Sequence, residues 1–306
     1  MRVGIDIGGT KTDAVAIRDD GAVEHQLRLP TGFGHDAVLD TAVAAVTDLA
    51  AAAGTDIAGF ESIGIGVPGA VDAAGRVVHA VNLGIDDLPL GAALAGRLGR
   101  PVRIDNDVNA AALGAFRLLG RDPEHSMAYL NLGTGLAAGL VLRGRLWRGA
   151  RGAAGEVGHI PVDPAGPECP CGQRGCLEMV ASGSAIARQW PTDDPKPARA
   201  LFAAAAAGEP LAVEVRSRLV ENVAAAVRLL VLTVDVDSVV IGGGLSSLGG
   251  ELLDDVVGVL RSWEGASAFL ASVDLSSRVA VVPAGFPAAA VGAALVGVAG
   301  EDSWPR

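Results

Sequence analysis

Short apolar segments separated by glycine-rich or acidic turns open the chain. Residues 2–7, 13–18 and 23–29 each read as a strand, with turns at 8–12 and 19–21 between them. Apolar runs of this length, bounded by turn residues, are typical of β-strands. The chain is therefore expected to begin as a β-meander rather than as a strand followed by a helix.

Amphipathic helices alternate with further strands up to residue 119, as the spacing of the apolar positions indicates. The elements expected there are helix 35–53, strand 62–67, helix 91–98, strand 102–104 and helix 108–119. Asp107 directly precedes the last of these helices. It is expected to cap that helix, because a carboxylate there accepts hydrogen bonds from free backbone N–H groups.

A second cycle of strands and helices begins at residue 127. The elements expected there are strands 127–132 and 137–142, helix 182–189, polar loop 191–197, helices 198–207 and 210–232, strand 238–241, helix 250–262, strand 279–282 and helix 287–299. Glycine-rich turns between strands occur at 8–12 and again at 133–135, which suggests a weak internal duplication into two α/β halves. A polar site is expected in the cleft between the halves.

The composition excludes several classes of protein. Only 4% of the 306 residues are aromatic although half are hydrophobic, so small aliphatic side chains must fill the core. No apolar run reaches the length of about 18 residues that a membrane span needs, and the first residues lack a signal-peptide pattern, which predicts a cytoplasmic protein. The formal net charge of −11, without a basic stripe, argues against nucleic-acid binding.

All three cysteines of the chain lie close together. Cys169, Cys171 and Cys176 follow the spacing Cys-x-Cys-x4-Cys, and His159 stands ten residues upstream. Three thiolates and an imidazole suit tetrahedral zinc, and four ligands leave no open position for catalysis. Free core cysteines or a redox pair are the alternatives, although the first two cysteines are too close for an easy disulfide. A structural zinc site is therefore expected.

Two carboxylates, Glu156 and Glu178, bracket the cysteine cluster. Held beside a rigid metal site, they are well placed to bind a hydroxylated ligand through charged hydrogen bonds. Solvation at the protein surface is the competing interpretation.

The first glycine-rich turn has the residues of a phosphate site. Asp6 ends the preceding strand, and the turn itself contains Gly8, Gly9, Thr10, Lys11 and Thr12. A P-loop is excluded, because a threonine precedes the lysine and the following segment is strand-like rather than helical. Backbone N–H groups of a glycine hairpin can still bind phosphate, and an ordinary glycine hairpin is the alternative.

Two other glycine motifs admit two interpretations each. Gly64-Ile65-Gly66-Val67-Pro68-Gly69 fits the letters of a dinucleotide fingerprint, but no helix opens after it, so a nicotinamide cofactor is excluded. The loop either admits a polar ligand close to its backbone or simply ends a strand. Ile241-Gly242-Gly243-Gly244 either packs against a nucleobase and ribose or forms a plain strand–helix turn.

The acidic triplet Asp105-Asn106-Asp107 lies between a strand and a helix, where ligands gather in α/β folds. Helix capping explains part of it, yet three acid or amide groups exceed what a cap requires. An ionised aspartate near a helix N-terminus can accept a proton from a substrate hydroxyl during phosphoryl transfer.

Taken in order, these motifs carry a resemblance that covers nearly the whole chain. The segments are Asp6-Ile7-Gly8-Gly9-Thr10-Lys11, Val67-Pro68-Gly69, Asn82-Leu83, Asp105-Asn106-Asp107-Val108-Asn109-Ala110, Leu132-Gly133-Thr134-Gly135, Glu156-Val157-Gly158-His159, Cys169-Pro170-Cys171-Gly172-Gln173-Arg174-Gly175-Cys176-Leu177-Glu178 and Ile241-Gly242-Gly243-Gly244. Together they resemble the ROK family (repressors, open reading frames, kinases). Two departures stand out: Ala137 and Ala138 replace usual glycines, and Ile85-Asp86-Asp87 follows where a tryptophan is common.

The resemblance implies an α/β, two-domain, actin-like and ribonuclease-H-like sugar kinase fold with ATP and Mg²⁺ in the interdomain cleft. The smaller domain is expected to comprise residues 1–118 and 288–306, and the larger domain residues 119–287. Repressor members carry an N-terminal helix-turn-helix, whereas this chain opens on the phosphate hairpin and so resembles the kinases.

The resemblance also implies roles for individual residues. Asp107 would be the base that takes the proton of the sugar hydroxyl, usually at O6. The residues expected to line the sugar are Gly69, Asn82, Asn106, Asp107, Glu156, His159 and Glu178. Those expected around the phosphates and Mg²⁺ are Asp6, Gly8, Gly9, Thr10, Lys11, Thr12, Gly133, Thr134 and Gly135, while Gly243 and Gly244 would lie by the adenosine. His159 would serve both zinc and sugar, through one ring nitrogen each.

The function implied by the resemblance is ATP-dependent phosphorylation of a hexose, with glucose as the first expectation. An N-acetylmannosamine or N-acetylglucosamine kinase is the alternative within the enzyme class. A sugar-binding regulator without catalysis is the alternative outside it. Relatives suggest a homodimer or homotetramer.

Overall fold

A computed structural model describes residues 1–283 and 285–298 of the chain, as two compact units. Unit 1 comprises Met1–His125, Gly139–Ala154 and the described residues from Pro287 onward. Unit 2 comprises Ser126–Ala138 and the described residues from Gly155 to Phe286. The expected return of residues 299–306 to the smaller domain lies outside the described residues.

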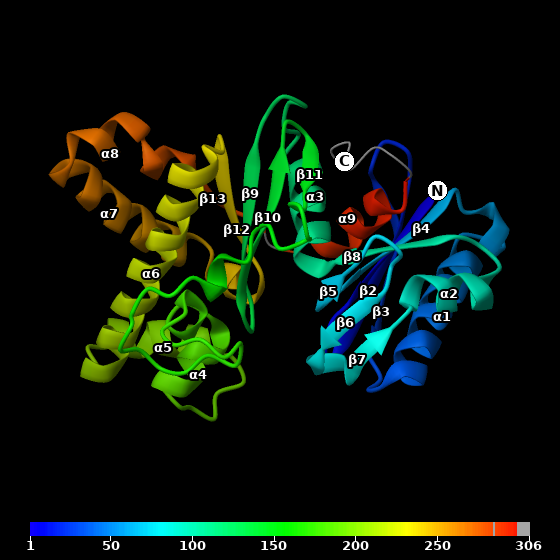
Figure 1. The fold of residues 1–306 in the computed structure, drawn as a ribbon, viewed down its shortest axis with the longest axis horizontal. Helices are drawn as coiled ribbons and strands as arrows, with labels where there is room; N and C mark the ends of the chain where they lie inside the picture. Colours follow the sequence, from blue (N-terminus) through cyan, green and yellow to red (C-terminus); the bar gives the residue numbers. More distant parts are fainter. Residues whose placement is uncertain (284, 299–306) are drawn as a thin grey trace. The chain divides into compact units, whose positions relative to one another are not determined.

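Unit 1 is built on a five-stranded sheet with the order β3-β2-β1-β4-β8 (Figure 1). Its strands are β1 (Arg2–Ile7), β2 (Lys11–Ile17), β3 (Val23–Pro30), β4 (Ser62–Val67) and β8 (Val102–Asn106). The expected meander is confirmed, since β1–β2 and β2–β3 pair antiparallel, while β4 pairs parallel with both β1 and β8. Parallel pairing places the ends of β1, β4 and β8 at one edge of the sheet.

Helices and a small second sheet complete unit 1. The helices are α1 (His35–Ala52), α2 (Leu90–Leu98), α3 (Asp107–Leu118) and α9 (Ala288–Val296). The loop expected after β4 contains a three-stranded sheet that the sequence pattern did not predict. Its strands are β5 (Ala70–Val71), β6 (Val77–Ala80) and β7 (Ile85–Leu88), joined by a short 3₁₀ helix, η2 (Val81–Leu83).

Helix α9 packs on β1, β4 and α3, and its backbone comes close to theirs. Glycines make this approach possible, since a Cβ on Gly4 would lie 2.0 Å from the Ala290 carbonyl oxygen and one on Gly64 would lie 1.9 Å from that of Ala293. A side chain at either glycine would therefore push the helix off the sheet. The last residue of the expected helix 287–299 lies beyond the described part of the chain.

The second sheet has the order β11-β10-β9-β12-β13, which repeats the strand order of the first. Its strands are β9 (Met127–Leu132), β10 (Leu136–Leu142), β11 (Arg145–Trp147), β12 (Ser238–Gly242) and β13 (Val279–Val281). Strand β10 begins in unit 2 and continues into unit 1, which contains β11. The two glycine hairpins, β1–β2 and β9–β10, occupy equivalent places in the two sheets, as the suggested duplication requires.

The helices of unit 2 are α4 (Gly183–Gln189), α5 (Pro197–Ala206), α6 (Pro210–Val234), α7 (Gly250–Ala266) and α8 (Ala268–Val273). Two of these helices pack on the strands of the unit, α6 on β12 and α7 on β13, and the other helices pack on these two. All except α8 were expected. Short 3₁₀ helices lie at three of the predicted site segments: η3 (Val157–His159), η4 (Leu177–Met179) and η5 (Gly244–Leu248).

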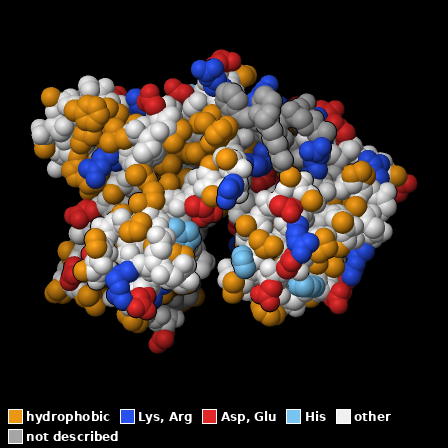
Figure 2. Space-filling view, in the orientation of Figure 1, with side chains coloured by type: hydrophobic (Ala, Val, Ile, Leu, Met, Phe, Trp, Pro, Cys, Tyr) orange, Lys and Arg blue, Asp and Glu red, His pale blue; other side chains and the backbone are white. Residues whose placement is uncertain are grey.

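Charged side chains are scattered over the face drawn in Figure 2, with basic groups standing among acidic ones. This distribution agrees with the absence of a basic stripe in the sequence. None of the helices in the described part of the chain is long and apolar enough to cross a membrane. The cytoplasmic location stays a prediction.

Candidate functional site

The acidic triplet lies where β8 passes into α3. Asn106 is the N-cap of α3: its Oδ1 accepts hydrogen bonds from the N–H groups of Val108 at 2.9 Å and Asn109 at 3.3 Å. The prediction that Asp107 caps this helix is therefore wrong, because Asp107 is the first helical residue. Asn106 has the extended backbone that an N-cap requires, whereas Asp107 is already helical and keeps its carboxylate in the first turn.

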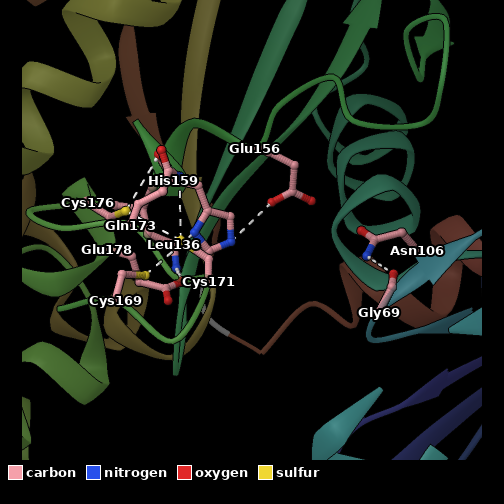
Figure 3. A network of polar contacts seen from close by, with 10 residues as sticks. All are labelled: Gly69, Asn106, Leu136, Glu156, His159, Cys169, Cys171, Gln173, Cys176 and Glu178. Atoms are coloured by element: carbon pink, nitrogen blue, oxygen red, sulfur yellow. Dashed lines mark hydrogen bonds and ion pairs between the residues drawn. The ribbon is translucent and has the colours of Figure 1, made fainter. Parts of the chain in front are cut away.

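Asn106 also connects the triplet to the glycine loop after β4. Its Nδ2 donates to the carbonyl oxygen of Gly69 at 3.0 Å (Figure 3). Gly69 has φ 97°, and a Cβ there would lie 2.7 Å from the Val78 carbonyl oxygen, so only glycine fits. Two predicted sugar residues from separate loops of unit 1 are thus in direct contact.

The β1–β2 hairpin presents its tip to solvent. The Gly8 N–H donates to the Lys11 carbonyl oxygen at 3.0 Å, and the intervening Gly9 and Thr10 are exposed, as is Lys11 itself. Thr12 differs from these, because it is buried with its hydroxyl 2.7 Å from that of Thr31. The hairpin tip therefore offers backbone N–H groups and one ammonium.

Asn82 lies beside this hairpin. An added Cβ on Gly9 would be 3.3 Å from the Cβ of Asn82, which is exposed in η2. The structure thus brings a predicted sugar residue next to a predicted phosphate residue within unit 1.

Asp6 has an unusual titration. Burial raises its pKa to about 7, the carboxylates of Asp107 and Asp13 add to the increase, and Lys11 opposes it. Desolvation and like charges both disfavour the ionised carboxylate. A cation placed at Asp6 would relieve this cost, so the residues present fit a divalent metal ion there.

The four candidate zinc ligands come together in unit 2, with ligand atoms that all lie within 4.8 Å of one another. Cys171 Sγ and Cys176 Sγ are 3.7 Å apart, and His159 Nδ1 is 3.9 Å from Cys169 Sγ (Figure 3). Zinc–sulfur bonds of about 2.3 Å in a tetrahedron place ligand atoms roughly 3.8 Å apart. The donor set and its spacing therefore fit zinc.

Gln173 reinforces this cluster from the turn between the cysteines. Its Nε2 donates to the His159 carbonyl oxygen at 3.0 Å and to Cys171 Sγ at 3.5 Å. Hydrogen bonds from Gln173, those of its backbone above all, lower the pKa of Cys171 to about 6, whereas burial raises the pKa of Cys176. The cysteines are not disulfide-bonded, and a thiolate is the form that binds metal.

The second ring nitrogen of His159 faces away from the cysteines. His159 Nε2 lies 3.9 Å from Glu156 Oε2, while Nδ1 faces Cys169 (Figure 3). This is the orientation that a histidine serving a metal through one nitrogen and a polar ligand through the other requires.

A pocket of about 440 Å³ in unit 2 lies beside the second glycine hairpin. It is lined by Gly133, Thr134, Gly183, Ser184, Ile186, Ala187, Pro195, Lys196, Pro197, Ala198, Arg199, Gly244, Leu245 and Ser247. Three of the predicted nucleotide residues line it, namely Gly133, Thr134 and Gly244. Gly135 and Gly243 do not.

Sequence reasoning missed the two cations of this pocket, Lys196 and Arg199. Lys196 precedes α5, and Arg199 within that helix donates from Nη2 to the Ser247 carbonyl oxygen at 2.9 Å. The rarity of lysine was the one signal in the sequence, since Lys196 and Lys11 are the only lysines in the chain.

Comparisons with known proteins agree on the family. The ROK family profile matches residues 2–296. A glucokinase from Halalkalibacterium halodurans is 34% identical over 274 residues, or 83% of each chain, and an N-acetylmannosamine kinase from Vibrio vulnificus is 34% identical over 81% of this chain and 84% of its own. A ROK family glucokinase from Streptomyces griseus, solved in complex with glucose and AMPPNP, has 31% identity and a TM-score of 0.78, covering 97% of this chain and 98% of its own.

The fold, the order of the motifs and these matches lead to one assignment. The strand order repeated in the two sheets is that of the actin-like, ribonuclease-H-like sugar kinases expected from the sequence. The chain belongs to the ROK family.

Proposed function

We propose that this protein is an ATP-dependent sugar kinase that phosphorylates a hexose at the 6-hydroxyl, with glucose as its substrate. The observation that carries the proposal is the similarity along 97% of the chain to a ROK glucokinase solved with glucose and AMPPNP. Each of the two units contains segments that resemble the family's motifs, and these segments include most of the candidate site residues.

Asp107 is the proposed catalytic base. Its carboxylate lies in the first turn of α3, where the helix N-terminus favours negative charge. It would accept the proton of the 6-hydroxyl as that oxygen attacks the γ-phosphate. Asn106, held on Gly69 at 3.0 Å, would orient the sugar beside it.

The other residues proposed to contact the sugar are Gly69, Asn82, Glu156, His159 and Glu178. Carboxylates bind sugar hydroxyls through charge-assisted hydrogen bonds, and His159 Nε2, which faces away from the cysteines, suits a hydrogen bond to a hydroxyl.

The pocket beside the second glycine hairpin is the proposed nucleotide site. Of its lining residues, Gly133 and Thr134 would contact the phosphates and Gly244 the adenosine, together with the neighbouring Gly135 and Gly243. Gly8 to Thr12 are also proposed to bind phosphate. The cations Lys196 and Arg199 on the pocket wall suit a polyanionic ligand. Asp6 would hold Mg²⁺, which supplies charge neutralisation to the transferred phosphate.

Zinc is proposed as a structural ion held by His159, Cys169, Cys171 and Cys176. With four protein ligands it would have no open coordination position. It would fix the turn that carries Glu156 and His159, and therefore contribute to sugar binding without entering the chemistry.

The second candidate within this class is an N-acetylmannosamine kinase, favoured by the 34% identity to the Vibrio vulnificus enzyme. A coupled assay of ADP release across glucose, mannose, N-acetylglucosamine and N-acetylmannosamine tests both. We expect the highest kcat/KM with glucose. A preference for an N-acetyl sugar would replace the first candidate by the second, and sugar binding without ADP release would favour a regulator.

The oligomeric state stays a prediction of a homodimer or homotetramer. Light scattering on the purified protein measures it directly, and a monomer at working concentrations would contradict it.

A further inference from the structure

One buried carboxylate in unit 1 holds three chain segments together. Asp105 at the end of β8 is 4% exposed. Its Oδ1 accepts hydrogen bonds from the Asn106 N–H at 2.8 Å and from Asn109 Nδ2 at 3.0 Å. Its Oδ2 accepts from Arg148, both from Nε at 2.8 Å and from Nη2.

The third segment is distant in the sequence. Arg148 follows β11 and stands eight residues before Glu156, and its carbonyl oxygen accepts a hydrogen bond from the Ala154 N–H at 3.1 Å. The two-donor contact with Asp105 fixes the guanidinium plane as well as its position. Arg148 thus anchors the start of this glycine-rich loop to the turn that carries the catalytic residues.

The hydrogen bonds of Asp105 extend to the residues proposed to bind the sugar. Asp105 holds the backbone of Asn106, whose side chain in turn caps α3 and donates to Gly69 at 3.0 Å. Asp107 is the next residue along the chain. A displacement of Asp105 would therefore also displace Asn106 and Asp107, which are proposed to bind the sugar and to take its proton.

We propose that Arg148 is a positioning residue for phosphoryl transfer, acting through Asp105 to fix the orientation of Asn106 and Asp107. The inference rests on the proposed kinase function. Removing the guanidinium leaves a buried carboxylate without its cation, and the vacated space either fills with water or is closed by movement of the neighbouring chain. Either change alters the acceptor that holds Asn106 and Asn109, and displaces the turn.

The test compares Arg148→Met and Arg148→Lys with the control Arg97→Met. Arg97 belongs to the same unit, but its ion pairs with Asp36 and Asp40 are exposed. We expect Arg148→Met to lower kcat by about 10²-fold, as small displacements of reacting groups do, and to raise the KM for glucose. The KM for ATP should stay near wild type, and Arg97→Met should change none of the three.

Chemical rescue separates positioning from a general loss of structure. Guanidinium ion at millimolar concentration should restore part of the kcat of Arg148→Met by occupying the vacated space, and Arg148→Lys should retain an intermediate kcat with wild-type melting temperature. Wild-type kcat in folded Arg148→Met overturns the inference, as does a loss that neither lysine nor guanidinium restores. Should wild-type protein bind glucose without turnover, the kinase proposal fails, and unchanged glucose affinity in Arg148→Met then overturns this one too.

Discussion

Glu178 is fixed to the second glycine hairpin by a hydrogen bond, in which the Leu136 N–H donates to its Oε2 at 2.8 Å (Figure 3). The same carboxylate oxygen would lie 2.4 Å from a Cβ placed on Gly135. A residue proposed to bind the sugar is thus held by the hairpin proposed to bind phosphate. A displacement of this hairpin would therefore move Glu178, so the proposed sugar and nucleotide contacts of unit 2 depend on each other.

This contact predicts the effect of Gly135→Ala. The added methyl group must displace the Glu178 carboxylate and break its hydrogen bond, which is worth about 1.5–3 kcal/mol for a charged acceptor. We expect the KM for glucose to rise by on the order of tenfold in steady-state assays. The control Gly258→Ala, where a Cβ meets nothing within 4 Å, should not change it.

A double variant tests the route of this effect. If Gly135→Ala acts through Glu178, combining it with Glu178→Gln should give less than the sum of the two separate losses. Fully additive losses would show that the glycine acts elsewhere.

The role of Asp107 predicts a separation of binding from turnover. Asp107→Asn removes the base but keeps the size of the side chain, so kcat should fall by about 10²–10⁴-fold. The dissociation constant for glucose, measured by calorimetry, should change much less. Turnover close to that of wild type in this variant would mean that another group takes the proton.

The raised pKa of Asp6 predicts a dependence of stability on pH. Its folded-state pKa of about 7 lies above the usual 3.8, so between these values the unfolded chain releases a proton that the folded chain keeps. The free energy of unfolding should therefore decrease as pH rises from about 4 to 7, by about 4 kcal/mol for a three-unit shift. Below pH 3.8 the Asp6 carboxyl is protonated in both the folded and the unfolded chain, so its full contribution to the free energy of unfolding is present.

Asp6→Asn removes this titration. Urea denaturation of nucleotide-free and magnesium-free protein should show the variant gaining stability over wild type as pH rises to 7, and no further gain above about pH 8. Exposed Asp86→Asn serves as the control and should follow the wild-type curve. If the free energy of unfolding changed with pH in the same way for wild type and Asp6→Asn, the pKa of Asp6 would not be raised in the folded protein.

The cysteine cluster predicts about one zinc per chain by metal analysis. Cys171→Ser should lower both zinc content and melting temperature, since metal binding contributes to folding. The KM for glucose should rise in step, because the turn carrying Glu156 and His159 loses its anchor. A zinc-free preparation with unchanged stability and activity would contradict the site.

Local sequence patterns predicted most of the strands and long helices, because period and turn residues are properties of neighbouring positions. They failed where contacts between segments distant in the sequence determine the secondary structure. The short strands β5, β6 and β7 form around the Gly69 loop by pairing with one another, and each is too short to show a pattern. The N-cap of α3 is Asn106 rather than Asp107, and the same Asn106 side chain meets Gly69, a contact between distant segments that no local pattern marks.

The candidate site divides in the same way. Cys169, Cys171 and Cys176 could be recognised from the sequence because these candidate metal ligands lie in one short segment, whereas His159 lies ten residues upstream. The contact between Asp105 and Arg148 was not readable, since 43 positions separate the two residues and nothing local marks them as partners. Lys196 and Arg199 were likewise hidden, because only the fold of α5 brings them to the glycine hairpin.

The packing of α9 has a consequence for biosynthesis. Unit 1 starts with the first residue of the chain, yet its sheet is covered by a helix that begins at Ala288. A growing polypeptide emerges from the ribosome N-terminus first, so the surface of β1 and β4 at Gly4 and Gly64 stays uncovered until α9 has been synthesised. Unit 2, which ends at Phe286, can be complete before that. A stop codon introduced before residue 288 would therefore leave the sheet of unit 1 without the helix that covers it.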